Sequence, residues 1–166
     1  MMLPDPNQLI DRLAEQMRPH VRQDCALLGI HTGGVWVMDA LIERLGVDLP
    51  RGVLDIAFYR DDFSRIGLHP EAKPSRIPFD IEGRHVLLID DVLYTGRTIR
   101  AAMNLVFDYG RPAAIRLAVL VDRGGRELPI CADFVGTRLE LEADRHVSLD
   151  RDADGRLQLV LGRSKA

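Results

Sequence analysis

The stretch that decides the fold is LLIDDVLYTGRTI, residues 87–99. A run of apolar residues leads directly into two adjacent acids, Asp90 and Asp91, and a short turn with hydroxyl groups and a glycine then enters a helical pattern. Backbone N–H groups at the start of a helix point outward and, with the helix dipole, favour an anion. The stretch therefore predicts a ligand site. The alternative is a plain strand–turn–helix whose aspartates cap the turn.

The turn Thr95-Gly96-Arg97-Thr98 has the residue types that suit a phosphate group. The glycine allows close approach to the backbone, two hydroxyls can donate hydrogen bonds, and the arginine adds positive charge. The two acids just before it are acceptors suited to vicinal hydroxyls, such as those of a ribose. The whole stretch thus predicts a ribose phosphate site. It lacks the GxxxxGK[ST] and GxGxxG patterns, which argues against kinase-like and dinucleotide-binding proteins.

Strand and helix patterns alternate along the rest of the chain. The expected strands are 25–30, 53–60, 85–90, 115–121 and 132–136, and the expected helical faces run through 9–17, 35–45 and 99–107. The last part of the chain alternates around Asp154-Gly155, which indicates a hairpin. This order predicts an α/β fold on a largely parallel sheet, in which ligands bind beyond the C-terminal ends of the strands. Thr32, Asp90 and Asp122 lie at or after such ends.

Composition narrows the class of protein. The 166 residues are 46% apolar and 28% charged, as expected of one soluble globular domain over 1–166. The formal net charge of −3 argues against nucleic-acid binding by bulk positive charge. Cys25 and Cys131 have no metal-ligand spacing and are expected to be reduced, buried thiols. With no membrane-span-length apolar stretch and no signal-peptide pattern, we expect a cytoplasmic protein.

Three stretches, taken in order, carry a family resemblance. VLLIDDVLYTGRT (86–98) resembles the phosphoribosyl pyrophosphate (PRPP) signature of the type I phosphoribosyltransferases. Its Leu-Tyr form resembles the PyrR-type pyrimidine operon regulators, which also have uracil phosphoribosyltransferase activity. AFYRDD (57–62) and the segment 110–136 agree with it, and the similarity runs from about residue 9 to residue 160. One departure is Gly125, where the family commonly has histidine.

The resemblance implies a fold and a reaction. The fold is a mostly parallel central sheet flanked by helices, with a flexible lid loop at 61–80 and a small base-binding hood. The reaction converts uracil and PRPP into UMP and pyrophosphate, with Mg²⁺ bound to the diphosphate and no metal held directly by protein ligands. The implied assembly is a homodimer or a higher symmetric oligomer.

The resemblance also assigns roles to residues. Asp90 and Asp91 hold the ribose hydroxyls as the catalytic acids, and Arg60 lies at the root of the lid, with Lys73 and Arg76 as candidate diphosphate contacts. The remaining PRPP- and UMP-binding residues are Thr32, Gly33, Gly34, Val92, Leu93, Tyr94, Thr95, Gly96, Arg97 and Thr98. Those beside the base are Asp122, Arg123 and Val147. From the residues alone, HTGG (31–34) is equally an ordinary turn, and Arg123 is equally a surface arginine that pairs Asp122 or Glu127.

A regulatory role requires RNA binding and hence a basic face. Family members that regulate transcription bind pyrimidine-operon mRNA. Acids and bases balance in the N-terminal segment 9–24 and in the last thirty residues. A local patch could come from Arg111, Arg116, Arg126 and Arg138. Two hypotheses follow: an active uracil phosphoribosyltransferase that also regulates, or an RNA-binding attenuator that senses UMP or UTP and has incidental activity.

Overall fold

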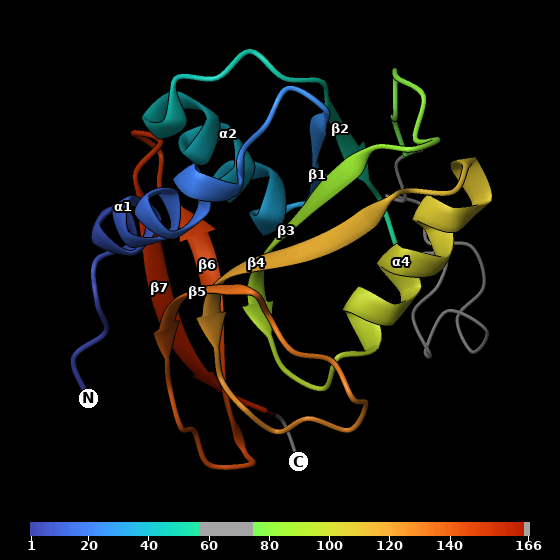
Figure 1. The fold of residues 1–166 in the computed structure, drawn as a ribbon. Helices are drawn as coiled ribbons and strands as arrows, with labels where there is room; N and C mark the ends of the chain where they lie inside the picture. Colours follow the sequence, from blue (N-terminus) through green and yellow to red (C-terminus); the bar gives the residue numbers. More distant parts are fainter. Residues whose placement is uncertain (57–74, 165–166) are drawn as a thin grey trace.

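The computed structural model describes residues 1–56 and 75–164, which form one central sheet, three helices and a separate hairpin (Figure 1). The sheet has five parallel strands in the order β2-β1-β3-β4-β5. They are β1 (Cys25–Ile30), β2 (Arg51–Leu54), β3 (His85–Leu93), β4 (Ala114–Asp122) and β5 (Phe134–Arg138). The predicted α/β fold with a parallel sheet is confirmed. The expected lid and the end of the expected strand 53–60 lie largely outside the described residues.

The helices cover both faces of the sheet. They are α1 (Pro6–Met17), α2 (Gly33–Leu45) and α4 (Arg97–Tyr109), and a short 3-10 turn (Arg18–His20) follows α1. Helices α1 and α2 lie on one face, and α4 lies on the other (Figure 1). Asp5 caps α1 by accepting a hydrogen bond from the Asn7 amide at 2.9 Å, and α2 ends at Gly46, whose φ of 63° suits glycine. None of the described helices is long and apolar enough to cross a membrane.

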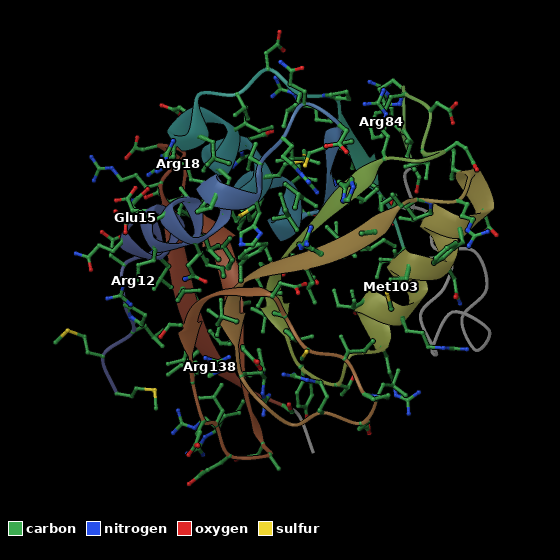
Figure 2. The ribbon with its side chains drawn as sticks, in the orientation of Figure 1. Arg12, Glu15, Arg18, Arg84, Met103 and Arg138 are labelled. Atoms are coloured by element: carbon green, nitrogen blue, oxygen red, sulfur yellow. The ribbon has the colours of Figure 1, made fainter. Side chains whose placement is uncertain are left out.

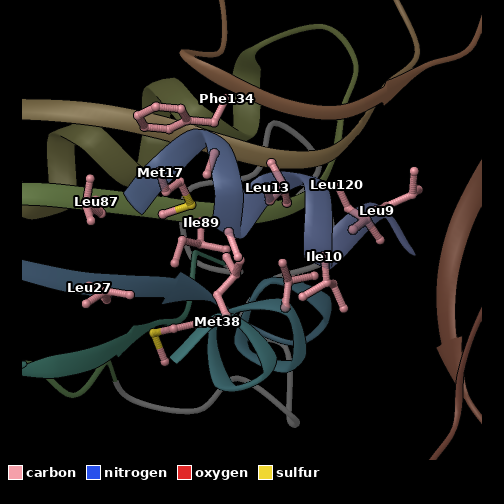
Figure 3. Close-up of a cluster of buried hydrophobic side chains, with 14 of the residues drawn as sticks. Leu9, Ile10, Leu13, Met17, Leu27, Met38, Leu87, Ile89, Leu120 and Phe134 are labelled. Carbon is pink, nitrogen blue, oxygen red and sulfur yellow. The ribbon is translucent and has the colours of Figure 1, made fainter. Parts of the chain in front are cut away.

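Strand alternation divides the core into two clusters. Leu87 and Ile89 of β3 face α1 and α2, whereas Val86 and Leu88 face α4. Figure 3 shows the first cluster, with Leu9, Ile10, Leu13 and Met17 of α1 directed at the sheet and Phe134 beside them. Because β3 is covered on both faces, it must be apolar along most of its length, as its sequence is.

Helix α1 also protects the edge of the sheet. The Gln16 side-chain amide donates to the Val135 carbonyl of β5 at 2.9 Å and accepts from the Val135 amide at 3.2 Å. These two bonds satisfy main-chain groups that an edge strand leaves unpaired.

The chain ends in the predicted hairpin. Strands β6 (Arg145–Arg151) and β7 (Leu157–Arg163) pair antiparallel as a separate two-stranded sheet. The turn is closed by bonds between the Asp152 amide and the Arg156 carbonyl, 2.9 Å, and between the Gly155 amide and the Asp152 carbonyl, 3.0 Å. Val147 and Leu149 of β6 are buried in the same cluster as α1. The hairpin is therefore part of the domain.

Three strands have an expected boundary that is wrong by at least two residues. β3 runs to Leu93 and thus includes both acids, because β4 continues beside it: Asp90 pairs with Val119, and Leu93 with Asp122. Acids are depleted in strands, which is why the pattern predicted an end at residue 90. β2 begins at Arg51 and ends at Leu54, and β5 spans 134–138 in place of 132–136.

Leu13→Ala tests the packing of α1. Leu13 is 0% exposed, and the substitution leaves a cavity between α1 and the sheet. We expect the free energy of unfolding in urea to fall by about 2–5 kcal/mol. The control Glu15→Ala, on the exposed face of the same helix, should change it by less than about 0.5 kcal/mol. Equal small effects of the two changes would contradict this packing.

Candidate active site

The site lies where β3 continues past the end of β1. Gly29 pairs with Ile89, and β1 ends one residue later at Ile30, whereas β3 continues to Leu93 beside β4. Asp90 and Asp91 stand at this step in the sheet. Parallel sheets bind ligands at such carboxyl ends.

Asp90 and Asp91 are consecutive residues near the end of β3. Asp90 is 5% exposed, and its Oδ1 accepts from the Asp91 amide at 2.9 Å. Asp91 is half-buried, and its Oδ1 accepts from the Val92 amide at 2.9 Å. The structure thus places both acids at the expected edge of the sheet.

The turn Thr32-Gly33-Gly34, which we call the diphosphate turn, lies against Asp91. A Cβ atom on Gly33 would collide with the Asp91 carboxylate, and one on Gly34 would lie 2.5 Å from the Ile89 carbonyl oxygen. Only glycine allows α2 to begin this close to β3. A cis peptide bond joins His31 and Thr32. The start of α2, with its outward amides, is therefore next to one of the two acids.

The turn Thr95–Thr98, which we call the phosphate turn, opens α4 at the same edge. Gly96 caps the helix with φ of 94°, a left-handed conformation that favours glycine. The Arg97 amide donates to the Thr95 hydroxyl at 3.2 Å. The side chains of Val92 and Leu93 pack against the two core clusters. These two residues could therefore contact a ligand through their main-chain groups.

A charged pair lies at the end of β4. Both carboxylate oxygens of Asp122 accept from Arg126 Nη2 at 2.8 Å, and Oδ1 also accepts from the Gly124 amide at 3.0 Å. Burial raises the pKa of Asp122, but the Arg126 hydrogen bond, the Gly124 amide and the positive charges of Arg126 and Arg138 together hold it below the ordinary value of 3.8. Asp122 is therefore an anion at neutral pH.

Arg123 is buried between two elements of the site. It is 7% exposed, its guanidinium carbon lies 3.8 Å from the centre of the Tyr94 ring, and Nη1 donates to the Arg145 carbonyl of β6 at 2.6 Å. Its Nε is buried and has no hydrogen-bond partner among the described residues. An unpaired buried donor at a ligand edge is a candidate ligand contact.

The alternative of a surface arginine at 123 is therefore wrong. Asp122 pairs with Arg126, and Glu127 pairs with Arg97 at 3.4 Å, with both side chains half exposed. Val147 is 6% exposed, and its side chain belongs to the core. Only its main chain, paired with Leu161 in the hairpin, could face a base.

Two further expectations concern the lid and a metal. Arg60 and Lys73 lie outside the described residues, whereas Arg76 is exposed and its main chain bridges Val53, with both N–H···O distances 2.8 Å. Within the described ranges, no three His, Cys, Asp or Glu side chains are grouped to hold a metal ion. Two adjacent carboxylates suit Mg²⁺, which is often bound by one or two carboxylates together with substrate phosphates.

Sequence reasoning did not assign Arg126 to the site. The sequence offers Arg126 only as one of four arginines that could form a local patch. In the structure its guanidinium binds Asp122, the Tyr94 carbonyl at 2.6 Å and the Ile130 carbonyl at 2.8 Å. The sequence does contain a hint of this pair, because Asp122 and Arg126 lie four residues apart in DRGGR. It was ambiguous, because such a pair outside a helix has no fixed geometry.

The edge of the sheet thus has two helix N-termini with acids between them, and the family of the chain agrees with this arrangement. The family model described as phosphoribosyl transferase domain matches residues 3–149. The chain belongs to the phosphoribosyltransferase family.

Curated relatives identify the branch of the family. "Bifunctional protein PyrR" of Pseudomonas paraeruginosa is 52% identical over 153 residues, which cover 90% of each chain. The protein of the same name from Nitrosococcus oceani is 56% identical over 139 residues, which cover 82% of this chain and 78% of that one. The resemblance to PyrR-type proteins is confirmed.

Solved structures confirm the type I phosphoribosyltransferase fold. A hypoxanthine phosphoribosyltransferase from Staphylococcus aureus superposes with a TM-score of 0.64 at 24% identity, covering 82% of this chain and 75% of that one. A hypoxanthine phosphoribosyltransferase from Trypanosoma cruzi gives 0.66 at 21% identity, covering 83% and 80%. At these sequence identities the similarity shows a shared fold and nothing further.

The lowered pKa of Asp122 predicts a pH-dependent stability. Below about pH 5 the unfolded chain binds a proton at Asp122 that the folded chain does not, so this contribution is lost as the pH falls through the folded-state pKa. We expect urea unfolding at about pH 7 and about pH 3 to show a smaller loss of stability in Asp122→Asn than in the wild type. The control Asp108→Asn, exposed on α4, should lose as much as the wild type. An unchanged loss in Asp122→Asn would contradict the ion pair.

Proposed function

We propose that this protein is a uracil phosphoribosyltransferase, which converts uracil and PRPP into UMP and pyrophosphate. One observation carries the proposal: two helix N-termini open at one edge of the sheet, with Asp90 and Asp91 between them. PRPP has phosphate groups at both ends of a ribose. Two anion sites on either side of carboxylates match this charge pattern.

In this proposal each of the two turns binds a different phosphate group of PRPP. The phosphate turn binds the 5′-phosphate through its main-chain amides and the Thr95 and Thr98 hydroxyls. The diphosphate turn presents its amides to the diphosphate, and Asp90 and Asp91 hold the ribose hydroxyls. As the C1–O bond loosens, positive charge develops on the ring, and nearby carboxylates stabilise it. Fixed turns also hold the ribose in position for attack by the base.

PRPP would carry Mg²⁺ on its diphosphate. When bound, it supplies positive charge that neutralises the departing diphosphate. Asp90 and Asp91 are the described carboxylates suited to complete its oxygen ligands.

Uracil is read where β4, the hairpin and Tyr94 meet. Its edge offers an acceptor, a donor and an acceptor, which main-chain groups can satisfy. Arg123 supports this position, because its buried Nε lacks a partner among the described residues and its Nη1 reaches the hairpin. Asp122 has both oxygens engaged by Arg126, so we assign it to hold the segment and not to accept the proton of uracil.

We propose regulation of pyrimidine gene expression through mRNA as a second function, since the curated relatives are named bifunctional. UMP or UTP is the proposed effector, and a symmetric oligomer in the cytoplasm the proposed form. The alternative is an RNA-binding attenuator with incidental activity.

The four arginines that could have formed a local patch do not all lie together. Arg111 precedes β4 and Arg138 pairs with its last residue, so nine strand residues, or roughly 30 Å, separate them. Arg126 is engaged inside the site. Glu15 of α1 lies between Arg12 of the same helix and Arg18 of the 3-10 turn that follows it (Figure 2).

Turnover with a panel of bases tests the enzyme. The protein is incubated with PRPP, Mg²⁺ and uracil, hypoxanthine, guanine or orotate. We expect nucleotide from uracil alone. Preference for a purine or for orotate, or no turnover of any base, would overturn the proposed activity.

Replacement of both acids tests the ribose site. Asp90→Asn with Asp91→Asn should reduce kcat with uracil by at least about a hundredfold, because two charges facing the ring are removed. Circular dichroism checks that the fold survives, and Asp108→Asn serves as the surface control. Turnover equal to that of the wild type would refute the role of the acids.

Titration with pyrimidine-leader RNA tests the second function. We expect affinity for the leader to exceed that for a scrambled RNA, to rise with UMP and to weaken with salt as phosphate contacts are screened. Equal affinity for the two RNAs would refute the regulatory function and leave the enzymatic function as the single proposal.

A further inference from the structure

The segment that follows β4, residues 123–130, wraps around the phosphate turn. The Arg123 amide donates to the Leu93 carbonyl at 3.0 Å, and the Glu127 and Leu128 amides donate to the Thr95 carbonyl at 2.9 and 3.1 Å. A Cβ on Gly96 would lie 3.0 Å from Ile130. The two loops are side by side at the lower edge of the sheet in Figure 1. The shape of the phosphate turn therefore depends on this segment.

Arg126 joins three parts of this edge. Nη2 binds both oxygens of Asp122 at 2.8 Å, Nη1 donates to the Tyr94 carbonyl at 2.6 Å, and Nε donates to the Ile130 carbonyl at 2.8 Å. Its side chain is 23% exposed. All three guanidinium nitrogens are thus engaged by the end of β4, by the residue before the phosphate turn and by the loop that covers it.

The bond to Tyr94 sets the direction of an amide. In a trans peptide the C=O and the following N–H point in opposite directions. Since Arg126 holds the Tyr94 carbonyl, the Thr95 N–H points away from the segment 123–130. The Thr95 carbonyl is held by Glu127 and Leu128, so the Gly96 N–H points away as well. Two successive donors are thereby turned to the same side before any phosphate arrives.

We propose that Arg126 is a positioning residue, which presets the amides of the phosphate turn for the 5′-phosphate by fixing the Tyr94 carbonyl. The inference rests on the proposed function. Arginine suits this role because its planar fork can bind a carboxylate and two carbonyls at once, whereas lysine offers one nitrogen on a flexible stem.

The test compares the affinities of UMP and uridine, which differ only in the phosphate. Isothermal titration calorimetry gives both for the wild type, Arg126→Gln, Arg126→Lys and the control Arg51→Gln, an exposed arginine at the start of β2. In Arg126→Gln we expect the preference for UMP over uridine to fall by about tenfold or more, as for lost bonds to a charged group. Arg126→Lys should lose part of it, and Arg51→Gln none.

The ratio separates positioning from general stability, because a loosened fold would weaken UMP and uridine alike. A wild-type preference that both Arg126 variants retain would overturn the role of Arg126 and leave the proposed function standing. A wild type that binds UMP no better than uridine would overturn both. If Arg126→Gln does not fold by circular dichroism, Arg126→Lys decides, and an unchanged preference in it overturns the inference.

Discussion

The close contact between the start of α2 and β3 is the constraint on which the site depends. Gly33 and Gly34 allow the helix to begin directly against Ile89 and Asp91, at the level where β1 has ended and β3 continues. Any side chain at these two positions would push the helix away from the strand. This contact brings the N-terminus of α2 to the acids. The turn at Gly96, which follows β3, brings the N-terminus of α4 to the same edge.

The charged residues at this edge form two groups. Asp90 and Asp91 lie on the strand between the helix starts, whereas Asp122, Arg123 and Arg126 lie in and after β4. In the second group Asp122 and Arg126 form an ion pair, in which Asp122 is held as an anion. We therefore propose that this ion pair shapes the turns and the base position, and that Asp90 and Asp91 hold the ribose.

Sequence patterns predicted the order of the elements well, because buried parallel strands and amphipathic helices leave clear apolar periods. The strand 25–30 and the hairpin were located correctly. The end of β3 was not, since two acids within a strand resemble its termination.

Long-range contacts could not be predicted from one sequence. The glycine contacts to β3, the stacking of Arg123 on Tyr94 and the inward turn of Arg126 arise only when distant loops meet. The most direct test of the central claim is a crystal structure with UMP. It should show the phosphate within hydrogen-bond distance of the amides of residues 95–98 and the ribose hydroxyls at Asp90 and Asp91. A phosphate bound elsewhere, with this turn vacant, would contradict the account.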